Sequence, residues 1–331
     1  MKPIMEDIYN IYSVSSAEVE INKYLKDKYK DGGFEVIQDK LYSIFLKKNG
    51  SSNKKVMIGF PLDEYGLMVR EIDSDNKIKF ILLEDVSPLV FINQRVNIVT
   101  KDYSNIKAVV CIDRKLAEST KTDFSVDDLY LKPICSREKA KSISIGDLVS
   151  LESPLLKEDN YLVGRSLNQK IFQYLSVDLL DEISKRDYSF ELYLGGISQS
   201  TIGFRGTKTA TYLIKPDVAI ALTGFEVNSS KPTVKLGDGV IVGHYDKQML
   251  PNKSLLNFIR DKFSTKPYVG FRGNDGSFIH KTIEGSKTVS MGIPVLNLST
   301  ANEMIDINDL NNLKKSILEL LDHLEEYVRE L

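Results

Sequence analysis

Side chains suited to metal or acid–base chemistry are few in this chain and lie far apart. It holds only three histidines, and no two of them have the HxxxH spacing of a metal-binding pair. His323 falls opposite the leucine stripe of a predicted helix, so we expect it at the surface. We expect His280 to be packed or hydrogen-bonded. His244 follows the apolar run 240–243 and would end a strand, where open α/β sheets form their sites, which makes it the histidine with a candidate role.

The two cysteines predict no disulfide framework, and the chain shows no membrane signal. Cys111 and Cys135 form no CxxC pair and lie in apolar or partly apolar stretches, so we expect small buried side chains. The first 12 residues carry acids and no apolar run of signal-peptide length. No segment approaches the roughly 18 apolar residues of a membrane span. We therefore expect a cytoplasmic protein without a membrane partner.

The balance of charge argues against a nucleic-acid binder. Forty-four Lys and Arg residues stand against 46 Asp and Glu, which leaves a net charge of -2. Nucleic-acid binding needs a basic face that releases counterions. The lysine-rich stretch 23–30 is interrupted by Asp27 and falls on a predicted helix, so it reads as a solvated face.

The first third of the chain predicts a helix followed by strands. Residues 4–30 are expected to be helical, because Ser15 and Glu18 have capping-box spacing and apolar residues form a stripe before Gly32. Strands are expected at 40–46 and 55–60. The second strand contains the continuous apolar run 56–60, which is typical of a central strand covered on both faces.

The pattern then changes twice. From Leu67 to about Leu156 we expect short strands at 67–72, 78–83, 95–99, 108–112 and 147–151, a spacing typical of a small β-barrel or sandwich. After Tyr161 we expect helices at 168–184, 206–214 and 307–331, alternating with strands at 190–194 and 218–222. This alternation predicts an α/β fold: a mixed, mostly parallel sheet with helices on both faces. Residues 1–66 and 157–331 would form that domain, with the β-rich domain 67–156 inserted in it.

Five stretches resemble metallopeptidase family 42, the glutamyl, deblocking and tetrahedral (TET) aminopeptidases. They occur in the family's order over roughly residues 10–325. In this sequence they read LDEYGLMV at 62–69, SREKA at 136–140, IGFRG at 202–206, PDVAIAL at 216–222 and GNDG at 273–276. The resemblance implies the zinc-exopeptidase fold, with an inserted domain of the dimerisation type.

The resemblance also implies a two-zinc site, in which the metals activate a water and a glutamate carries the proton. The family's first histidine ligand falls on Pro61, which has no side-chain donor. Asp63 is retained, but in the family it orients that missing histidine. The bridging aspartate falls on Asn168, which is similar in shape but neutral.

The remaining zinc ligands are replaced as well. The catalytic and the ligating glutamate fall on Ser200 and Thr201, and the aspartate of the second strand block falls on Thr223. The last histidine falls within a residue or two of Ser299. Zinc is held by Cys, His and carboxylate, three or four per ion. Small neutral residues at all these positions predict that neither zinc nor another cofactor is bound.

The sequence also offers residues for a magnesium or calcium site and for a serine–lysine pair. Asp63, Glu64, Asp275 and Glu226 could gather at the old site and hold one magnesium or calcium ion, although carboxylates at strand ends are also ordinary loop residues. Lys170 and Ser200 would form a serine–lysine pair only if the fold brings them together. Nothing in their spacing favours this.

The sequence thus favours a pseudo-peptidase that acts as a binding or scaffold protein. Its first partner would be a second copy of itself, in a homodimer or a twelve-subunit particle. A further partner would be a peptide or small ligand in the cleft where the family binds its substrate, or an active paralogue. The alternative is an active, metal-dependent aminopeptidase that removes N-terminal residues from peptides with two zinc ions in a rebuilt site. A hydrolase of another class has no support in the sequence.

Overall fold

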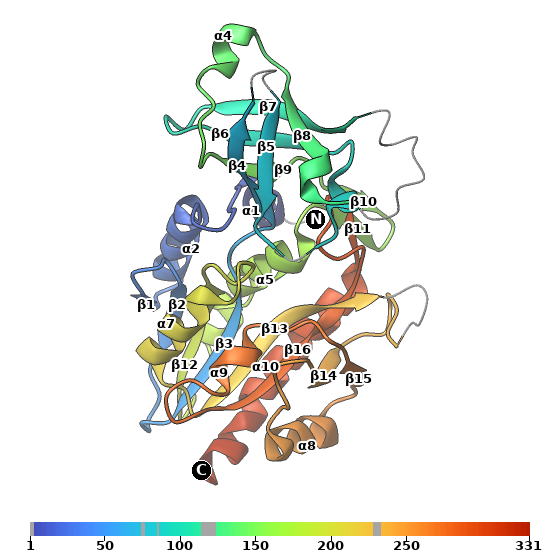
Figure 1. Ribbon diagram of the computed structural model, residues 1–331. Coiled ribbons are helices and arrows are strands. Elements are labelled where there is room, and N and C mark those ends of the chain that lie inside the picture. Colours follow the sequence, from blue (N-terminus) through green and yellow to red (C-terminus); the bar gives the residue numbers. More distant parts are fainter. Residues whose placement is uncertain (1–2, 74–76, 85, 114–123, 228–232) are drawn as a thin grey trace.

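A closed barrel of short strands stands at one end of the molecule, above a large mixed sheet (Figure 1). The structure, a computed structural model, describes residues 3–73, 77–84, 86–113, 124–227 and 233–331. The barrel strands follow one another in the order β4 (Gly66–Ile72), β5 (Ile78–Leu82), β8 (Leu129–Pro133), β7 (Asn105–Ile112), β6 (Arg95–Val99) and β9 (Leu148–Leu151). Three short helices flank them: η1 (Pro88–Phe91), η2 (Val126–Asp128) and α4 (Arg137–Ala140).

Eleven of the described strands form the large sheet. In spatial order nine of them are β1 (Glu35–Gln38), β2 (Ile44–Lys48), β12 (Glu191–Ile197), β3 (Lys55–Pro61), β13 (Val218–Val227), β16 (Lys287–Leu296), β17 (Glu303–Asp306), β11 (Tyr161–Gly164) and β10 (Leu156–Glu158). Strand β14 (Ile241–Tyr245) pairs with β16, and β15 (Lys266–Val269) pairs with β14. The central strands β12, β3, β13 and β16 run parallel. Because parallel strands end at the same edge, residues that follow β3 and β12 lie together.

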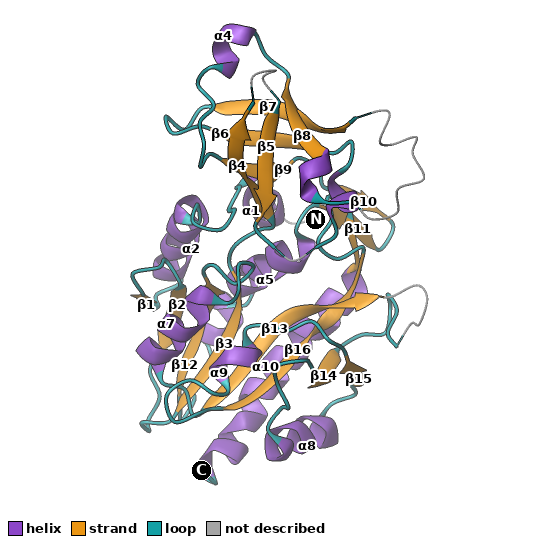
Figure 2. Cartoon of the chain, in the orientation of Figure 1, coloured by secondary structure: helices purple, strands orange, loops and turns teal. Residues whose placement is uncertain are grey.

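Helices cover both faces of this sheet (Figure 2). One face carries α1 (Pro3–Asn10), α2 (Val19–Asp31), α5 (Leu167–Asp178), α6 (Leu180–Ser184), α8 (Lys253–Lys262) and α10 (Ile307–Arg329). The other face carries α7 (Arg205–Ile214) and α9 (Gly276–Ile279). The middle of β3 is buried on both sides, with Val56 and Ile58 in the first core and Met57 in the second, as its unbroken apolar run predicts.

The predicted fold class is confirmed, and the β-rich segment is a closed barrel rather than a sandwich. The single helix expected at 4–30 is wrong: α1 ends at Asn10 and α2 begins at Val19. The predicted capping box does not form there. The Ser15 hydroxyl binds Asp63 instead, and the Glu18 carboxylate accepts the N–H of Gln199. Tertiary hydrogen bonds of these two polar side chains therefore replace the local cap.

Several smaller expectations also change. The helix expected at 168–184 breaks at Leu179 into α5 and α6. Strands β1, β8, β10, β11, β15, β16 and β17 and helix α8 were not predicted, although β16 is a central strand of the large sheet. Cys111 and Cys135 are free and half-buried rather than buried. No helix within the described ranges has both the length and the apolar character needed to cross a membrane.

Candidate functional site

The sequence-predicted site residues follow the carboxyl ends of the central strands. Pro61 closes β3, Ser200 and Thr201 come three and four residues after β12, and Thr223 lies in β13. Asn168 lies in the first turn of α5 at the same edge. This is where open α/β sheets place their binding sites.

Asp63 is fully buried and accepts four hydrogen bonds from this part of the chain. The hydroxyls of Ser15 and Thr201 each lie 2.5 Å from its Oδ2. The backbone N–H groups of Ser200 and Thr201 donate to it over 2.7 and 3.1 Å. Burial raises the pKa of Asp63, while these hydrogen bonds oppose the rise. Oδ2 accepts three of these hydrogen bonds and Oδ1 accepts one, so the chain itself occupies most of the acceptor capacity of this carboxylate.

A second buried carboxyl, Asp275, holds the Ser200 side chain from the other side. The Ser200 hydroxyl lies 2.9 and 3.1 Å from the two oxygens of Asp275, and the Thr207 hydroxyl donates to Oδ1 over 2.5 Å. Burial raises the pKa of Asp275 to about 7; nearby Asp63 adds to the rise, and the two hydroxyls oppose it. Such a carboxyl exchanges protons near neutral pH, but it lies in a network of small hydroxyl groups rather than beside a histidine.

Asn168, at the position of the family's bridging aspartate, is held in one orientation. Its Oδ1 accepts the backbone N–H of Gly224 over 2.5 Å, and its Nδ2 donates to the hydroxyl of Tyr65 over 3.0 Å. Because the Gly224 N–H can only donate, the amide oxygen must face it, and the other contact is made by the NH₂ group. An NH₂ group cannot ligate a cation, so this side chain does not bridge two metals.

The last predicted position, Ser299, is buried next to an acid that the sequence analysis missed. The Ser299 N–H donates to Glu303 over 2.7 Å, and Glu303 also accepts the N–H of Asn168 over 2.7 Å. Burial raises the pKa of Glu303 to about 7, against these two hydrogen bonds and the charge of Arg272. Glu303 opens the short strand β17, which ends on a second acid, Asp306, so the sequence gives no signal that singles out Glu303. Thr223 is half-buried, and among the described residues its hydroxyl donates to the carbonyl of Gly224 over 3.4 Å.

The donor set does not fit two zinc ions. Zinc sites need three or four ligands from His, Cys or carboxylate. Within the described residues, no group of three or more His, Cys, Asp or Glu side chains is arranged to hold a metal. The carboxyls of Asp63, Asp275 and Glu303 each accept at least two hydrogen bonds from hydroxyl or N–H groups of the chain. A cation would have to displace these donors.

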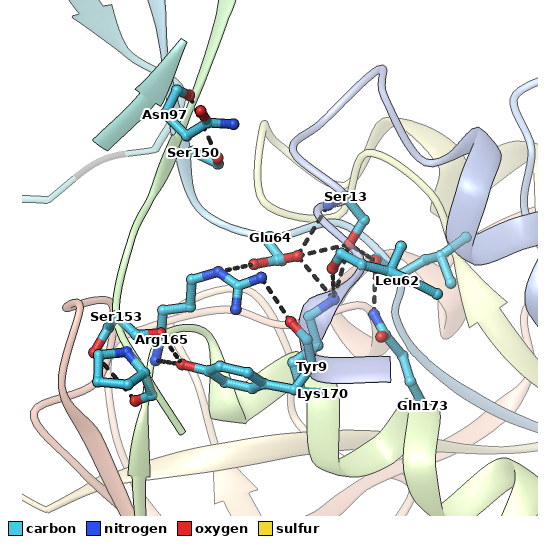
Figure 3. Close-up of polar contacts among 12 residues, drawn as sticks. Tyr9, Ser13, Leu62, Glu64, Asn97, Ser150, Ser153, Arg165, Lys170 and Gln173 are labelled. Atoms are coloured by element: carbon cyan, nitrogen blue, oxygen red, sulfur yellow. Dashed lines mark hydrogen bonds and ion pairs between the residues drawn. The ribbon is translucent and has the colours of Figure 1, made fainter. Parts of the chain in front are cut away.

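Glu64 turns away from Asp63 into a separate buried ionic cluster (Figure 3). Its carboxylate lies 2.8 Å from Lys170 Nζ and 3.4 Å from Arg165 Nε, and all three side chains are at most 2% exposed. Lys170 Nζ also donates to the carbonyl of Ile11 over 2.6 Å. Asp63, Glu64, Asp275 and Glu226, which the sequence offered as an alternative site for one ion, therefore do not gather around a common point. Lys170 does not approach Ser200 as a serine–lysine pair would require.

Electrostatics in this cluster follow from two cations sharing one carboxylate. Burial acts to raise the pKa of Glu64, but Arg165 and Lys170 outweigh it and hold that pKa below its ordinary value. Burial lowers the pKa of Lys170 to about 8; Glu64 opposes this, and the like charge of Arg165 adds to it. The cluster ties the segment between α1 and α2 to α5, so it is a structural neighbour of the site.

The three histidines lie outside the site. His323 is exposed on α10, as expected, and packs edge-on against Phe263. His280 Nδ1 lies 2.9 Å from the carbonyl of Gly276, which agrees with the expected hydrogen bonding. His244 is half-buried on β14, and burial together with Arg260 lowers its pKa. It does not line the cavities at the strand ends.

Two connected spaces lie over the strand ends. A small cavity of about 60 Å³ is bounded by Pro61, Asn168, Thr223 and Asp275. A cleft of about 1250 Å³ runs from there between the barrel and the large sheet, and Ser299 lies in its wall. Both spaces are lined by Glu84 of the barrel, Thr201 and Arg272. Glu84 and Arg272 form an ion pair across the gap, which the sequence analysis did not foresee.

Comparison with known proteins agrees with this architecture. The lysyl aminopeptidase of Pyrococcus furiosus is 24% identical over 343 residues, which cover 97% of this chain and 97% of that protein. The structure of a TET aminopeptidase from the marine sediment archaeon Thaumarchaeota archaeon SCGC AB-539-E09 superposes with a TM-score of 0.90 at 20% identity, covering 99% and 97% of the two chains. The TET1 peptidase of Pyrococcus horikoshii, which can assemble into a tetrahedron or a large octahedral shell, superposes with a TM-score of 0.85 at 19% identity. The match covers 96% of this chain and 98% of that one. The sequence profile of the M42 glutamyl aminopeptidases matches residues 43–315, and the chain belongs to that family.

Proposed function

We propose that this chain is a non-catalytic member of its family, a pseudo-peptidase that works by binding rather than by hydrolysis. The observation that carries the proposal is the closed hydrogen-bond network of Asp63, Ser200, Thr201 and Asp275. Every polar group of these four side chains is engaged by another group of the chain. The network satisfies its carboxyls with hydroxyl and N–H donors, whereas a zinc site satisfies them with cations.

The charge of the pocket supports the same proposal. Burial raises the pKa of Glu18, Asp275 and Glu303 to about 7 in each case. Carboxyls that ligate zinc are ionised, because the metal holds the charged form. Burial therefore favours the neutral form of these acids, and the neutral side chains of Ser200, Thr201 and Asn168 add no charge to this part of the chain.

The cleft that remains is wide enough to bind a peptide or a small molecule. Its volume of about 1250 Å³ exceeds the range of roughly 300–1,000 Å³ that is usual for ligand pockets. The barrel side is apolar and includes Met68, Ile81 and Leu83. Phe271 extends from the opposite wall with 77% of its surface exposed. Charged residues of both signs line the cleft as well: Glu84, Arg205, Glu226, Lys247 and Arg272. Mixed walls of this kind suit a peptide-like ligand better than a nucleic acid, which needs a basic face.

We further propose that the chain self-associates through its inserted domain, delimited by residues 67–156 between the two parts of the α/β domain. The barrel is complete although it supplies no zinc ligand, and Ile134 and Ile145 on it are 61% and 69% exposed. A twofold homodimer is the proposed minimal state, and a twelve-subunit particle or a mixed assembly with an active paralogue would extend it. The cytoplasm is the proposed compartment, because the free thiols of Cys111 and Cys135 stay reduced there.

An aminopeptidase screen tests the central proposal against its alternative, an active enzyme with two zinc ions in a rebuilt site. Protein purified without chelator is assayed on a panel of aminoacyl nitroanilides and unblocked peptides, with and without added zinc. We expect background rates, since metal activation of water and a positioned base each contribute orders of magnitude. The variant Thr201→Glu should also stay at background, because the other ligands are still absent.

The screen has one decisive contrary outcome. Turnover that follows the protein through purification, is raised by zinc and is lost in Asp275→Ala would falsify the pseudo-peptidase proposal. Asp217→Ala, at a half-buried acid whose carboxylate accepts the N–H of Lys55 at the opposite end of the sheet, is the matched control for loss of a carboxylate.

A further inference from the structure

Two residues that line the small cavity at the strand ends each carry a buried oxygen atom that lacks a donor within the described residues. Gln169 is 1% exposed, and its Oε1 has no hydrogen-bond partner among the described residues. The Glu84 side chain is 10% exposed, and its Oε2 is equally without a donor in that part of the chain. Both residues line the cavity of about 60 Å³. A buried acceptor without a donor costs roughly 1–3 kcal/mol, so a donor-rich ligand would be favoured here.

A cation faces these acceptors across the cavity. Arg272 lines the same space, pairs with the other oxygen of Glu84, and lies with its guanidinium 5.8 Å from the ring centre of Tyr65. Its side chain is 40% exposed. The guanidinium can therefore turn towards a ligand without a change in the core. An arginine fork matches the geometry of a carboxylate and binds it with two parallel hydrogen bonds.

We propose that this cavity binds the zwitterionic head of a free α-amino acid. Glu84 and Gln169 accept the ammonium group, and Arg272 binds the carboxylate. The inference rests on the proposed function, because it requires a pocket held by its own hydrogen bonds and not by zinc. It makes the chain a receptor for free amino acids in place of a peptide-cleaving enzyme.

The size of the cavity agrees with this ligand. A cavity volume of about 10–15 Å³ holds one water molecule. The cavity of about 60 Å³ therefore accommodates roughly the five heavy atoms of an amino-acid head: the nitrogen, the α-carbon and the three atoms of the carboxylate. The side chain of the amino acid would extend into the wide cleft, where Phe204 and Arg272 line both spaces. We therefore expect specific recognition of the ammonium and carboxylate groups and little selectivity for the side chain.

The charge balance agrees as well. A zwitterion adds no net charge to the cavity, and it replaces the single Glu84–Arg272 ion pair with two pairs, one to each end of the ligand. The unpartnered Oε2 of Glu84 and Oε1 of Gln169 then each gain an N–H donor. A peptide has its ammonium and carboxylate groups too far apart to bridge Glu84 and Arg272 in this way.

Isothermal titration calorimetry on metal-free protein tests the proposal with defined probes. Leucine and lysine are expected to bind with dissociation constants below about 1 mM. Leucinamide lacks the carboxylate, and N-acetyl-leucine lacks the ammonium group. Each should bind at least about tenfold more weakly than leucine, because a charged hydrogen-bond partner is lost. Leu-Gly-Gly keeps the ammonium group but moves the carboxylate away, and it should be weakened similarly.

Variants connect binding to the named side chains. Arg272→Gln and Glu84→Gln should each weaken leucine binding at least about tenfold, and Arg272→Lys should fall between Arg272→Gln and the wild type. Arg186→Gln is the matched control: this arginine pairs with Glu182 and Asp322 on the surface and should leave affinity unchanged. Circular dichroism of each variant verifies folding.

The outcomes separate this inference from the proposed function. No heat with leucine or lysine at 10 mM, equal binding of leucinamide, or unchanged affinity in Arg272→Gln would each overturn the amino-acid proposal. Binding of Leu-Gly-Gly without binding of leucine would overturn it and leave a peptide-binding pseudo-peptidase standing. Release of leucine from Leu-Gly-Gly would instead overturn the proposed function itself.

Discussion

Replacing Asp275 by asparagine should make the protein less sensitive to pH and more stable, relative to wild type, as the pH rises. Burial raises the pKa of this carboxyl from its ordinary 3.8 to about 7. The folded protein therefore binds a proton that the unfolded chain releases at pH values between about 4 and 7. It follows that Asp275 contributes stability at low pH, and that this contribution is lost as the pH rises through 7. Asparagine cannot ionise and keeps an acceptor for Ser200 and Thr207.

The size of the effect follows from the linkage between pKa and stability. Each pH unit between the two pKa values changes the free energy of unfolding by about 1.4 kcal/mol. Because the folded carboxyl is already half ionised at pH 7, the stability of Asp275→Asn relative to wild type should rise by about 2 kcal/mol between pH 5 and pH 7. The pKa values of Glu18 and Glu303 are also raised to about 7. They change the free energy of unfolding of the variant and of the wild type by the same amount at each pH, so their effect cancels in the difference.

Urea denaturation at pH 5, 6, 7 and 8, at one protein concentration, measures this difference. Asp181→Asn is the control, since that side chain is 90% exposed, and its curves should run parallel to wild type. Parallel curves for Asp275→Asn would refute the reasoning. A variant that is less stable than wild type by a growing margin towards pH 8 would show that the carboxylate is needed in its charged form, as in a metal site.

Two further predictions concern the buried ionic cluster and assembly. Lys170→Met should lower the free energy of unfolding, measured by urea denaturation, by about 3–5 kcal/mol, because it removes the closest cation from buried Glu64. The control Lys185→Met, at a surface ion pair, should lower it by under about 1 kcal/mol. Equal losses in the two variants would contradict this account of the cluster. Light scattering at micromolar concentration and moderate salt should give at least a dimer, with about 800 Å² buried per subunit. A 37.4 kDa monomer would refute the proposed self-association.

The strand and helix pattern could be predicted where hydrophobic periodicity was strong. The apolar run 56–60 indicated a central strand, and the leucine stripe after Ile307 indicated the final helix; both are present as β3 and α10. The helix expected across residues 11–18 failed because Ser15 and Glu18 look like a local cap in the sequence. In the structure they bind residues 48 and 181 positions away. Hydrogen bonds between such distant residues leave no periodic signal.

The candidate site was predictable in its location but not in its bonding. Alignment with the family placed Asp63, Ser200 and Thr201 near one another, and the structure brings them into hydrogen-bond contact. Asp63 and Glu64 are adjacent acids, and nothing in the sequence indicates that Glu64 pairs with Lys170 while Asp63 faces the site. The Glu84–Arg272 pair joins the barrel to a loop beyond β15, so it depends on how the two parts of the fold meet. Local sequence carries no information on that arrangement.

Zinc content measured on protein purified without chelator tests the central claim most directly. The account predicts fewer than about 0.2 zinc ions per chain by elemental analysis, because a stable site needs three or four His, Cys or carboxylate ligands. The Asp63 carboxylate already accepts four hydrogen bonds from the chain. One or two zinc ions per chain that survive dialysis and leave only with chelator would contradict it.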